Sequence, residues 1–140
     1  MRTLPITVAA DADYPLPGLL TLPDGAGPFP AVLLVHGSGP QDRDEAVGPN
    51  RPFRDPAVGL AALGVASLRY DKRTFAHGKR LADALQGRLS VEEEVIRDAL
   101  CVAALLRAEP LIRPDPAFPL GHCLGSMLAP RTDAVDRAFC

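Results

Sequence analysis

The chain has 140 residues, enough for one domain with its own core. Hydrophobic residues make up 47% of it and charged residues 23%, and this balance excludes a wholly disordered chain. The net charge of −2 excludes nucleic-acid binding through bulk positive charge, and the longest apolar run, residues 99–106, is too short to span a membrane.

The cysteines and the N-terminus indicate the cellular compartment. Cys101, Cys123 and Cys140 are odd in number and far apart, which excludes a framework of disulfides and a paired Cys-x-x-Cys metal site. The first residues lack the apolar stretch of a secretion signal. We therefore expect a reduced, cytoplasmic protein that binds neither membranes nor nucleic acids.

The first part of the chain predicts strands separated by turns. Residues 6–10 and 16–22 are short apolar runs divided by a polar segment, a pattern typical of two strands joined by a turn. Residues 31–35 are apolar without alternation and are bounded by Gly and Pro, which predicts a strand buried on both faces. A glycine-rich segment, residues 36–40, follows directly, and we call it the glycine loop.

The middle of the chain predicts a helix followed by a second buried strand. Asp55 is the expected N-cap of the helix, Pro56 its first residue, and Gly64 its end. Residues 65–70 are again mostly apolar and predict the strand.

Two further helices are expected after this strand. Residues 81–85 predict a short one. Ser90 and Glu93 have the spacing of a capping box, so a long helix is expected to begin there and to end at Pro110.

A short strand at residues 117–120 and a last helix complete the pattern. This helix is expected to run from Leu124 towards Cys140, with a kink or break at Pro130. Strands that alternate with helices predict an α/β fold, here a three-layer α/β/α arrangement around a mostly parallel sheet. Because functional loops lie at the carboxyl ends of parallel strands, the segments after residues 31–35 and 117–120 should meet at one edge.

The segment after the last strand is the first candidate site. It reads Gly121-His122-Cys123-Leu124-Gly125, and we call it the cysteine turn. Glycines on both sides of Cys123 relieve crowding in a sharp turn from strand to helix, and a helix N-terminus favours a thiolate or an oxyanion. The alternative is a plain strand-end turn with a buried cysteine.

The glycine loop is the second candidate site. It reads His36-Gly37-Ser38-Gly39-Pro40, and its backbone N–H groups are able to turn inward and bind an oxyanion. The alternative is an ordinary turn of Gly and Pro residues. We do not expect His36 to act as a general base.

Three segments together carry a resemblance to a known family. They are residues 27–40 (GPFPAVLLVHGSGP), 68–73 (LRYDKR) and 120–125 (LGHCLG). Their order and spacing resemble bacterial α/β hydrolases of the esterase and acyl-peptidase type, over residues 16–131. The resemblance implies that residues 1–140 are the N-terminal part of a single α/β-hydrolase domain, truncated after the helix that follows the cysteine turn.

The resemblance also implies a reaction and its residues. Cys123 lies where the family has its nucleophilic serine, and the backbone N–H groups of Ser38 and Leu124 would form the oxyanion hole. The reaction would be hydrolysis of a small-molecule carboxylic ester through a covalent acyl-enzyme, with no cofactor or metal.

The chain departs from the family pattern near its end. Ser126 stands where the family has glycine, and Pro119 lies in a strand that is central in the family, so we expect that strand to be an exposed edge here. The 17 residues after Cys123 include Asp133 and Asp136 but no histidine, so the family's catalytic acid and histidine are missing. We therefore expect an incomplete hydrolase that is weakly active or inactive by itself.

Other polar residues are interpreted as structural groups: His77 as an exposed loop residue, Asp71 as a cap of its loop, His122 as a packing residue, and residues 92–94 as a favourable first helical turn. Asp42 and Asp44, near His36 in the sequence, are too few to indicate a metal site.

Two non-enzymatic alternatives remain open at this point. The chain is either a truncated remnant or a half-domain that needs a complementing chain, and its exposed sheet edge would then promote self-association. A nucleotide-binding module is the third class, although the glycine loop lacks the third glycine of the dinucleotide fingerprint and no Walker sequence occurs.

Overall fold

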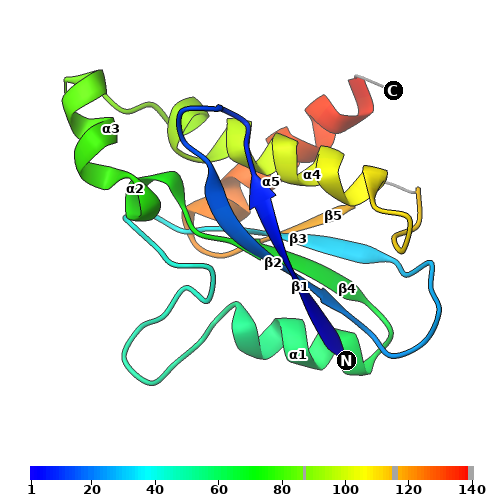
Figure 1. Ribbon diagram of the computed structural model, residues 1–140. Coiled ribbons are helices and arrows are strands. Elements are labelled where there is room, and N and C mark those ends of the chain that lie inside the picture. Colours follow the sequence, from blue (N-terminus) through cyan, green and yellow to red (C-terminus); the bar gives the residue numbers. More distant parts are fainter. Residues whose placement is uncertain (87, 115–116, 139–140) are drawn as a thin grey trace.

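A five-stranded sheet forms the centre of the computed structural model, which describes residues 1–86, 88–114 and 117–138, with side chains described up to Arg131 (Figure 1). The strands lie in the order β1-β2-β4-β3-β5. Their bounds are β1 (Arg2–Val8), β2 (Leu16–Leu22), β3 (Ala31–Val35), β4 (Ala66–Tyr70) and β5 (Phe118–Gly121).

The sheet is mixed, and the prediction of a mostly parallel sheet is wrong. β1 pairs antiparallel with β2, and β2 pairs antiparallel with β4, whereas β3 is parallel to both β4 and β5. Two consecutive strands can lie parallel only when a crossover connection joins them. The short turn between β1 and β2 instead makes a hairpin, and this hairpin then lies against β4 in the opposite direction.

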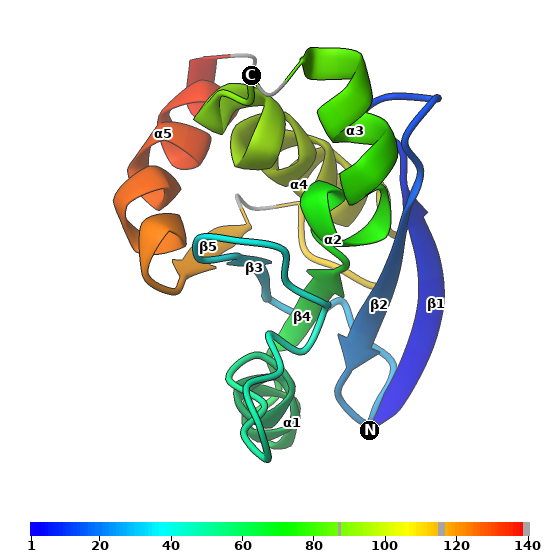
Figure 2. The ribbon, with the colours of Figure 1, turned by 90° about the vertical axis from the view of Figure 1, so that its left-hand side faces the viewer.

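Helices cover both faces of the sheet (Figure 2), so the three layers are confirmed. α1 (Arg54–Ala62) lies on one face, and α4 (Arg97–Ala108) and α5 (Leu124–Ala138) lie on the other. The remaining helical segments are α2 (Arg73–Ala76), which was not predicted, α3 (Gly78–Leu85) and the π-helical turn η1 (Glu92–Ile96). No helix in these described ranges has the length and apolar character that crossing a bilayer requires.

The start of the helical segment at Ser90 agrees with the prediction, whereas the start of α1 does not. The capping box is confirmed, because Ser90 N donates to the Glu93 carboxylate (2.9 Å) and Glu93 N donates to Ser90 Oγ (3.3 Å). Asp55 is not the N-cap of α1, which instead begins after Phe53 without a side-chain cap. Phe53 is buried against Leu34 in a small cluster, so packing and not capping sets this start.

Two prolines near the end of the chain behave differently. α5 runs past Pro130 without interruption. Pro119 lies in β5, whose only neighbour among the described strands is β3, so the expected edge position is confirmed. An edge strand tolerates proline because the missing N–H then removes no bond to an outer strand.

The core lies mainly between the sheet and α4. Its members include residues of all the inner strands and the apolar face of α4, among them Leu33, Leu68, Val102 and Leu106. β3 and β4 are buried along their length, as expected for strands covered on both faces. This rigid centre holds the carboxyl ends of β3 and β5 side by side.

Candidate active site

The glycine loop and the cysteine turn meet at one edge of the sheet, as predicted. β3 and β5 are parallel neighbours, so both segments leave the sheet at the same edge. His122 N donates to the carbonyl of Val35 at 3.1 Å. A Cβ added to Gly37 would lie 3.2 Å from Cys123 Cβ, so the two segments are in contact.

The cysteine turn is a tight turn that only glycine permits on both sides of Cys123. Cys123 itself has φ +52°, a value that non-glycine residues rarely adopt. A Cβ on Gly121 would lie 2.3 Å from the backbone of Gly125, and a Cβ on Gly125 would lie 2.0 Å from the carbonyl oxygen of Val35. Cys123 is exposed, so the alternative of a buried cysteine is wrong.

Hydrogen bonds within the turn fix its shape. Gly125 N donates to His122 O at 2.8 Å, and Ser126 N donates to Cys123 O at 3.0 Å. The hydroxyl of Ser126 donates to Gly121 O at 2.6 Å. The serine that departs from the family pattern therefore braces the turn.

The glycine loop and the cysteine turn each contain a backbone N–H group that makes no hydrogen bond within the described residues. In the part of the chain that the structure describes, neither Ser38 N nor Leu124 N donates a hydrogen bond to a protein atom. Gly37 N, by contrast, is used, because it donates to the carboxylate of Glu45 at 2.8 Å.

Glu45 is a site residue that the sequence analysis missed. Its carboxylate is 2% exposed; Oε1 accepts from Gly37 N, and Oε2 lies 2.9 Å from Nδ1 of His122. Glu45 also has φ +52°, which marks its loop as constrained. His122 is thus an exposed partner of Glu45, and its interpretation as a packing residue is wrong. No pattern in the sequence pairs two residues so far apart.

Lys72 braces the glycine loop from the other side. Its buried ammonium donates to the carbonyls of Gly37 (2.7 Å) and Gly39 (3.0 Å) and to the carboxylate of Glu94. These bonds use all three donors of the ammonium group. Glu94, interpreted above only as part of a favourable first turn, is therefore also the ion-pair partner of Lys72.

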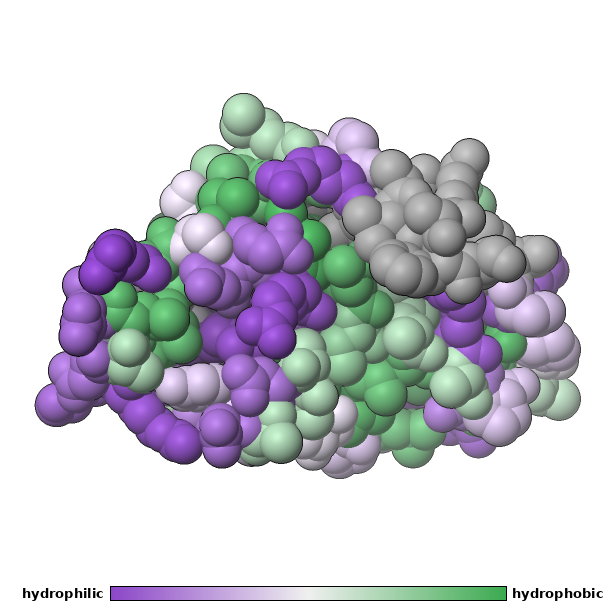
Figure 3. All heavy atoms as spheres, turned by 90° about the horizontal axis from the view of Figure 1, so that it is seen from above, coloured by the Kyte–Doolittle hydropathy of each residue, from purple (hydrophilic) through white to green (hydrophobic). Residues whose placement is uncertain are grey.

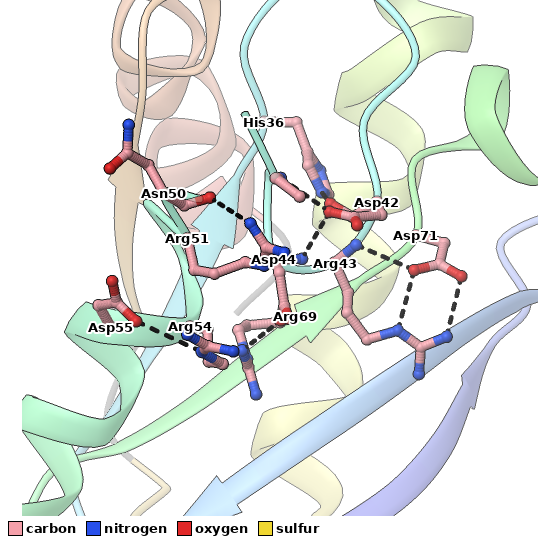
Figure 4. Close-up of polar contacts among 11 residues, drawn as sticks. His36, Asp42, Arg43, Asp44, Asn50, Arg51, Arg54, Asp55, Arg69 and Asp71 are labelled. Carbon is pink, nitrogen blue, oxygen red and sulfur yellow. Dashed lines mark hydrogen bonds and ion pairs between the residues drawn. The ribbon is translucent and has the colours of Figure 1, made fainter. Parts of the chain in front are cut away.

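The loop that follows the glycine loop is held by carboxylates, as Figure 4 shows. Asp71 accepts from Arg43 N and from two guanidinium nitrogens of Arg43, each at 2.9 Å. The loop that it caps is thus the one after the glycine loop, whereas the prediction placed the cap in the loop that Asp71 itself begins. Asp42 accepts from two backbone N–H groups of its own loop, and Asp44 pairs with Arg69. Within the described ranges, no three or more His, Cys, Asp and Glu side chains are placed to hold a metal.

His36 and His77 contact groups other than Cys123. His36 is buried, its Nε2 lies 3.2 Å from Asp42 O, and its ring packs against Phe53 and Tyr70. Burial, together with the nearby charge of Lys72, lowers the pKa of His36 to about 4, so the ring is neutral at pH 7. The ring of His77 lies 2.7 Å from the carbonyl of Pro15.

Three other residues named in the sequence analysis lie outside the described part, in their side chains or entirely. The side chains of Asp133 and Asp136 and all of Cys140 are not among the described groups.

Comparison with known proteins relates the chain to part of an esterase. No protein-family model matches it. Over 123 residues it is 49% identical to Esterase EstD of Thermotoga maritima, a match that covers 88% of this chain. The chain spans only 28% of the length of that esterase.

Solved structures show the same fold. The 2,6-dihydroxy-pseudo-oxynicotine hydrolase matches with a TM-score of 0.65 at 21% identity, over 94% of this chain and 32% of the hydrolase. A dienelactone hydrolase from Anabaena variabilis matches with 0.64 at 22% identity, over 91% of this chain and 55% of the other. Est1E from Butyrivibrio proteoclasticus matches with a TM-score of 0.63 at 19% identity, over 89% of this chain and 44% of Est1E. The mixed sheet of this chain therefore corresponds to part of the α/β-hydrolase fold.

Proposed function

We propose that this chain is the N-terminal part of an α/β-hydrolase domain that acts on small-molecule carboxylic esters, with Cys123 as the nucleophile. The observation that carries the proposal is the exposed Cys123 at φ +52° between two obligatory glycines, packed against the glycine loop. Such a turn between a strand and a helix presents a nucleophile in the manner of a nucleophile elbow. The likeness to Esterase EstD supports the same substrate class.

The oxyanion hole consists of the backbone N–H groups of Ser38 and Leu124. Ser38 follows Gly37, which contacts Cys123, and Leu124 follows Cys123 itself. Neither N–H group is used by the protein within the described residues. They would bind the negative charge that develops on the carbonyl oxygen during attack. Glu45 keeps Gly37 N out of this role by accepting its hydrogen bond.

The reaction is an acyl transfer in two steps. The thiolate of Cys123 attacks the carbonyl carbon, a C–S bond forms, the ester C–O bond breaks, and the departing alkoxide takes up the proton that the thiol lost. Water then attacks the thioester, which releases the carboxylic acid and restores the thiol.

We further propose that release of the acyl group is slow in these 140 residues alone. Of the three histidines in the sequence, His36 and His77 are bonded to backbone carbonyls, and His122 pairs with Glu45. None of these contacts joins a histidine to Cys123. A general base for the second step would come from residues outside this chain segment.

The test is the reaction of the purified chain with p-nitrophenyl acetate. The expected result is a rapid release of nitrophenol that stops at one equivalent per chain, with a single acetyl group on Cys123 by mass spectrometry. Cys123→Ala should abolish the burst and Cys101→Ala should keep it. The absence of acetylation at Cys123, or a burst that survives Cys123→Ala, would overturn the proposal.

A second candidate function is that of a half-domain completed by another polypeptide. β5 has no strand on its outer side among the described residues. Phe118 and Leu120 of β5 are 63% and 43% exposed, and Met127 of α5 is 77% exposed. An open edge with exposed apolar side chains favours pairing with a further strand. A second copy of the chain is the competing occupant, through self-association at the same edge.

Coexpression distinguishes the two occupants. The half-domain reading expects that the remaining part of Esterase EstD, supplied as a separate chain, forms a stable complex and restores multiple turnover. Light scattering of the chain alone that shows a dimer lost in Leu120→Lys would favour self-association instead. A chain that stays monomeric and does not bind the remaining part of Esterase EstD would overturn this second candidate.

A further inference from the structure

A cavity with a volume of about 280 Å³ lies beside the glycine loop, outside the residues assigned to the reaction. Pro40 of the loop forms one wall, α3 forms another through Leu81, Ala82 and Leu85, and Leu89 follows on the chain. Seen from above, hydrophobic residues gather among hydrophilic ones on the side of the molecule where α3 lies (Figure 3).

The lining of this cavity is almost entirely apolar. Among the described residues that line it, Thr74 alone has a polar side chain, and its hydroxyl already donates a long hydrogen bond, 3.5 Å, to Gly39 O. None of these described lining residues is charged. A charged ligand group would lose its hydration here without gaining a partner, whereas a hydrocarbon gains by leaving water.

The cavity and the reacting group share the same loop. Pro40 is two residues from Ser38 and three from Gly37, which contacts the cysteine turn. Three residues reach at most about 11 Å, so the cavity wall at Pro40 lies no farther than that from Gly37, which contacts Cys123. Lys72 ties Gly37 and Gly39 together, so the cavity wall and the Ser38 N–H belong to one braced segment.

We propose that this cavity binds an unbranched hydrocarbon substituent of the ester substrate, and so selects esters of short to medium chain length. The volume lies just below the range of sites for drug-sized ligands, which suits a single chain and not a large ring system. The proposal rests on the proposed ester hydrolysis. The hydrocarbon is either the acyl chain or the chain of the alcohol, and the experiment separates these sources.

The first experiment measures binding without any turnover. Hexanol is titrated into chain labelled at the leucine methyl groups, and NMR shifts of Leu81, Leu85 and Leu89 are followed. We expect saturable shifts at these three leucines. Ala82→Phe should fill the cavity and remove the saturation. Ala84→Phe places the same ring at an exposed position of α3 that does not line the cavity, so it should bind hexanol as before.

The second experiment measures acyl transfer to Cys123 with two series of esters. In one, the acyl group of p-nitrophenyl esters is lengthened from acetate to hexanoate; in the other, the alcohol of an acetate is lengthened from methyl to hexyl. One series should show a preference of at least about tenfold for the longer chain, lost in Ala82→Phe and kept in Ala84→Phe. The series that shows it identifies the acyl or the alcohol side.

The two experiments separate the cavity from the chemistry. Saturable hexanol binding without any transfer to Cys123 would overturn the proposed hydrolysis and support the cavity as a hydrocarbon site. Transfer without chain-length preference, or an equal effect of Ala82→Phe and Ala84→Phe, would overturn the cavity proposal and leave the hydrolysis standing. The absence of saturable shifts at the three leucines also contradicts it.

Discussion

The carboxylate of Glu45 lies 2.9 Å from Nδ1 of His122. Through its other oxygen, Glu45 also holds the backbone N–H of Gly37, so one buried side chain joins the glycine loop to the cysteine turn. The two segments that carry the proposed chemistry are therefore joined directly by this carboxylate and by the packing of Gly37 on Cys123. The bond from His122 N to Val35 O adds a tie from the cysteine turn to the end of β3, directly before the glycine loop.

Replacement of Glu45 should destabilise the fold. Glu45→Ala leaves the buried N–H of Gly37 without an acceptor, and we expect the free energy of unfolding to fall by about 1–3 kcal/mol. Glu45→Gln retains an amide oxygen for Gly37 and should cost less. Urea unfolding of both variants measures the difference, and equal stability of wild type and Glu45→Ala would contradict the bridging role.

The glycines of the cysteine turn should not tolerate a side chain. In Gly125→Ala the added carbon would lie 2.0 Å from Val35 O, so we expect a loss of about 1–3 kcal/mol or a failure to fold. Gly59 lies within α1 in open space and serves as the matched control. Gly59→Ala should raise stability by about 0.5–1 kcal/mol, because alanine favours the helix. Thermal unfolding of both variants checks the contrast.

The two described cysteines should differ in reactivity. Burial raises the pKa of the Cys101 thiol, which lowers its thiolate fraction at pH 7, and its side chain is only partly accessible. Cys123 is exposed. In a Cys140→Ala background, iodoacetamide should therefore modify Cys123 before Cys101, as peptide mass spectrometry will show. Faster modification of Cys101 would contradict the placement of the two thiols.

The buried His36 should make stability depend on pH. Its pKa is lowered to about 4 in the folded chain, against an ordinary value of about 6.5, so the unfolded chain binds the extra proton between these values. The contribution of the neutral His36 ring to the free energy of unfolding is thus fully present above about pH 6.5. It decreases by about 3 kcal/mol as the pH falls towards 4. His36→Gln should remove this part of the slope. An unchanged slope in the variant would refute the prediction.

The ion pair between Arg73 and Asp98 should be costly to break. Both side chains are almost fully buried, and the guanidinium donates to both carboxylate oxygens at 2.6 and 3.0 Å. Asp98→Ala leaves a buried cation with the more distant Asp11 and the ring face of Tyr14, and it should cost about 3–5 kcal/mol. Asp83→Ala, at an exposed ion pair with Lys79, should change stability by less than about 1 kcal/mol. Chemical unfolding of the two variants measures this difference.

Much of the local structure was predictable, because it follows from short-range rules. The apolar runs predicted β2 and β3 at their observed bounds, and Ser90 and Glu93 predicted the start of the helical segment before α4. The start of α1 was not predictable in this way, because the burial of Phe53 outweighs the capping preference of Asp55.

The candidate site likewise has a part that local sequence rules predict and a part that depends on tertiary contacts. The sequence alone determined that Cys123 lies in a sharp turn between a strand and a helix, because two flanking glycines and the preceding apolar run impose it through backbone sterics. The tertiary structure decided the mixed strand order and the braces Glu45 and Lys72. Those depend on groups that lie far apart in the chain and meet only when the sheet has formed, and no local preference of either partner records the contact.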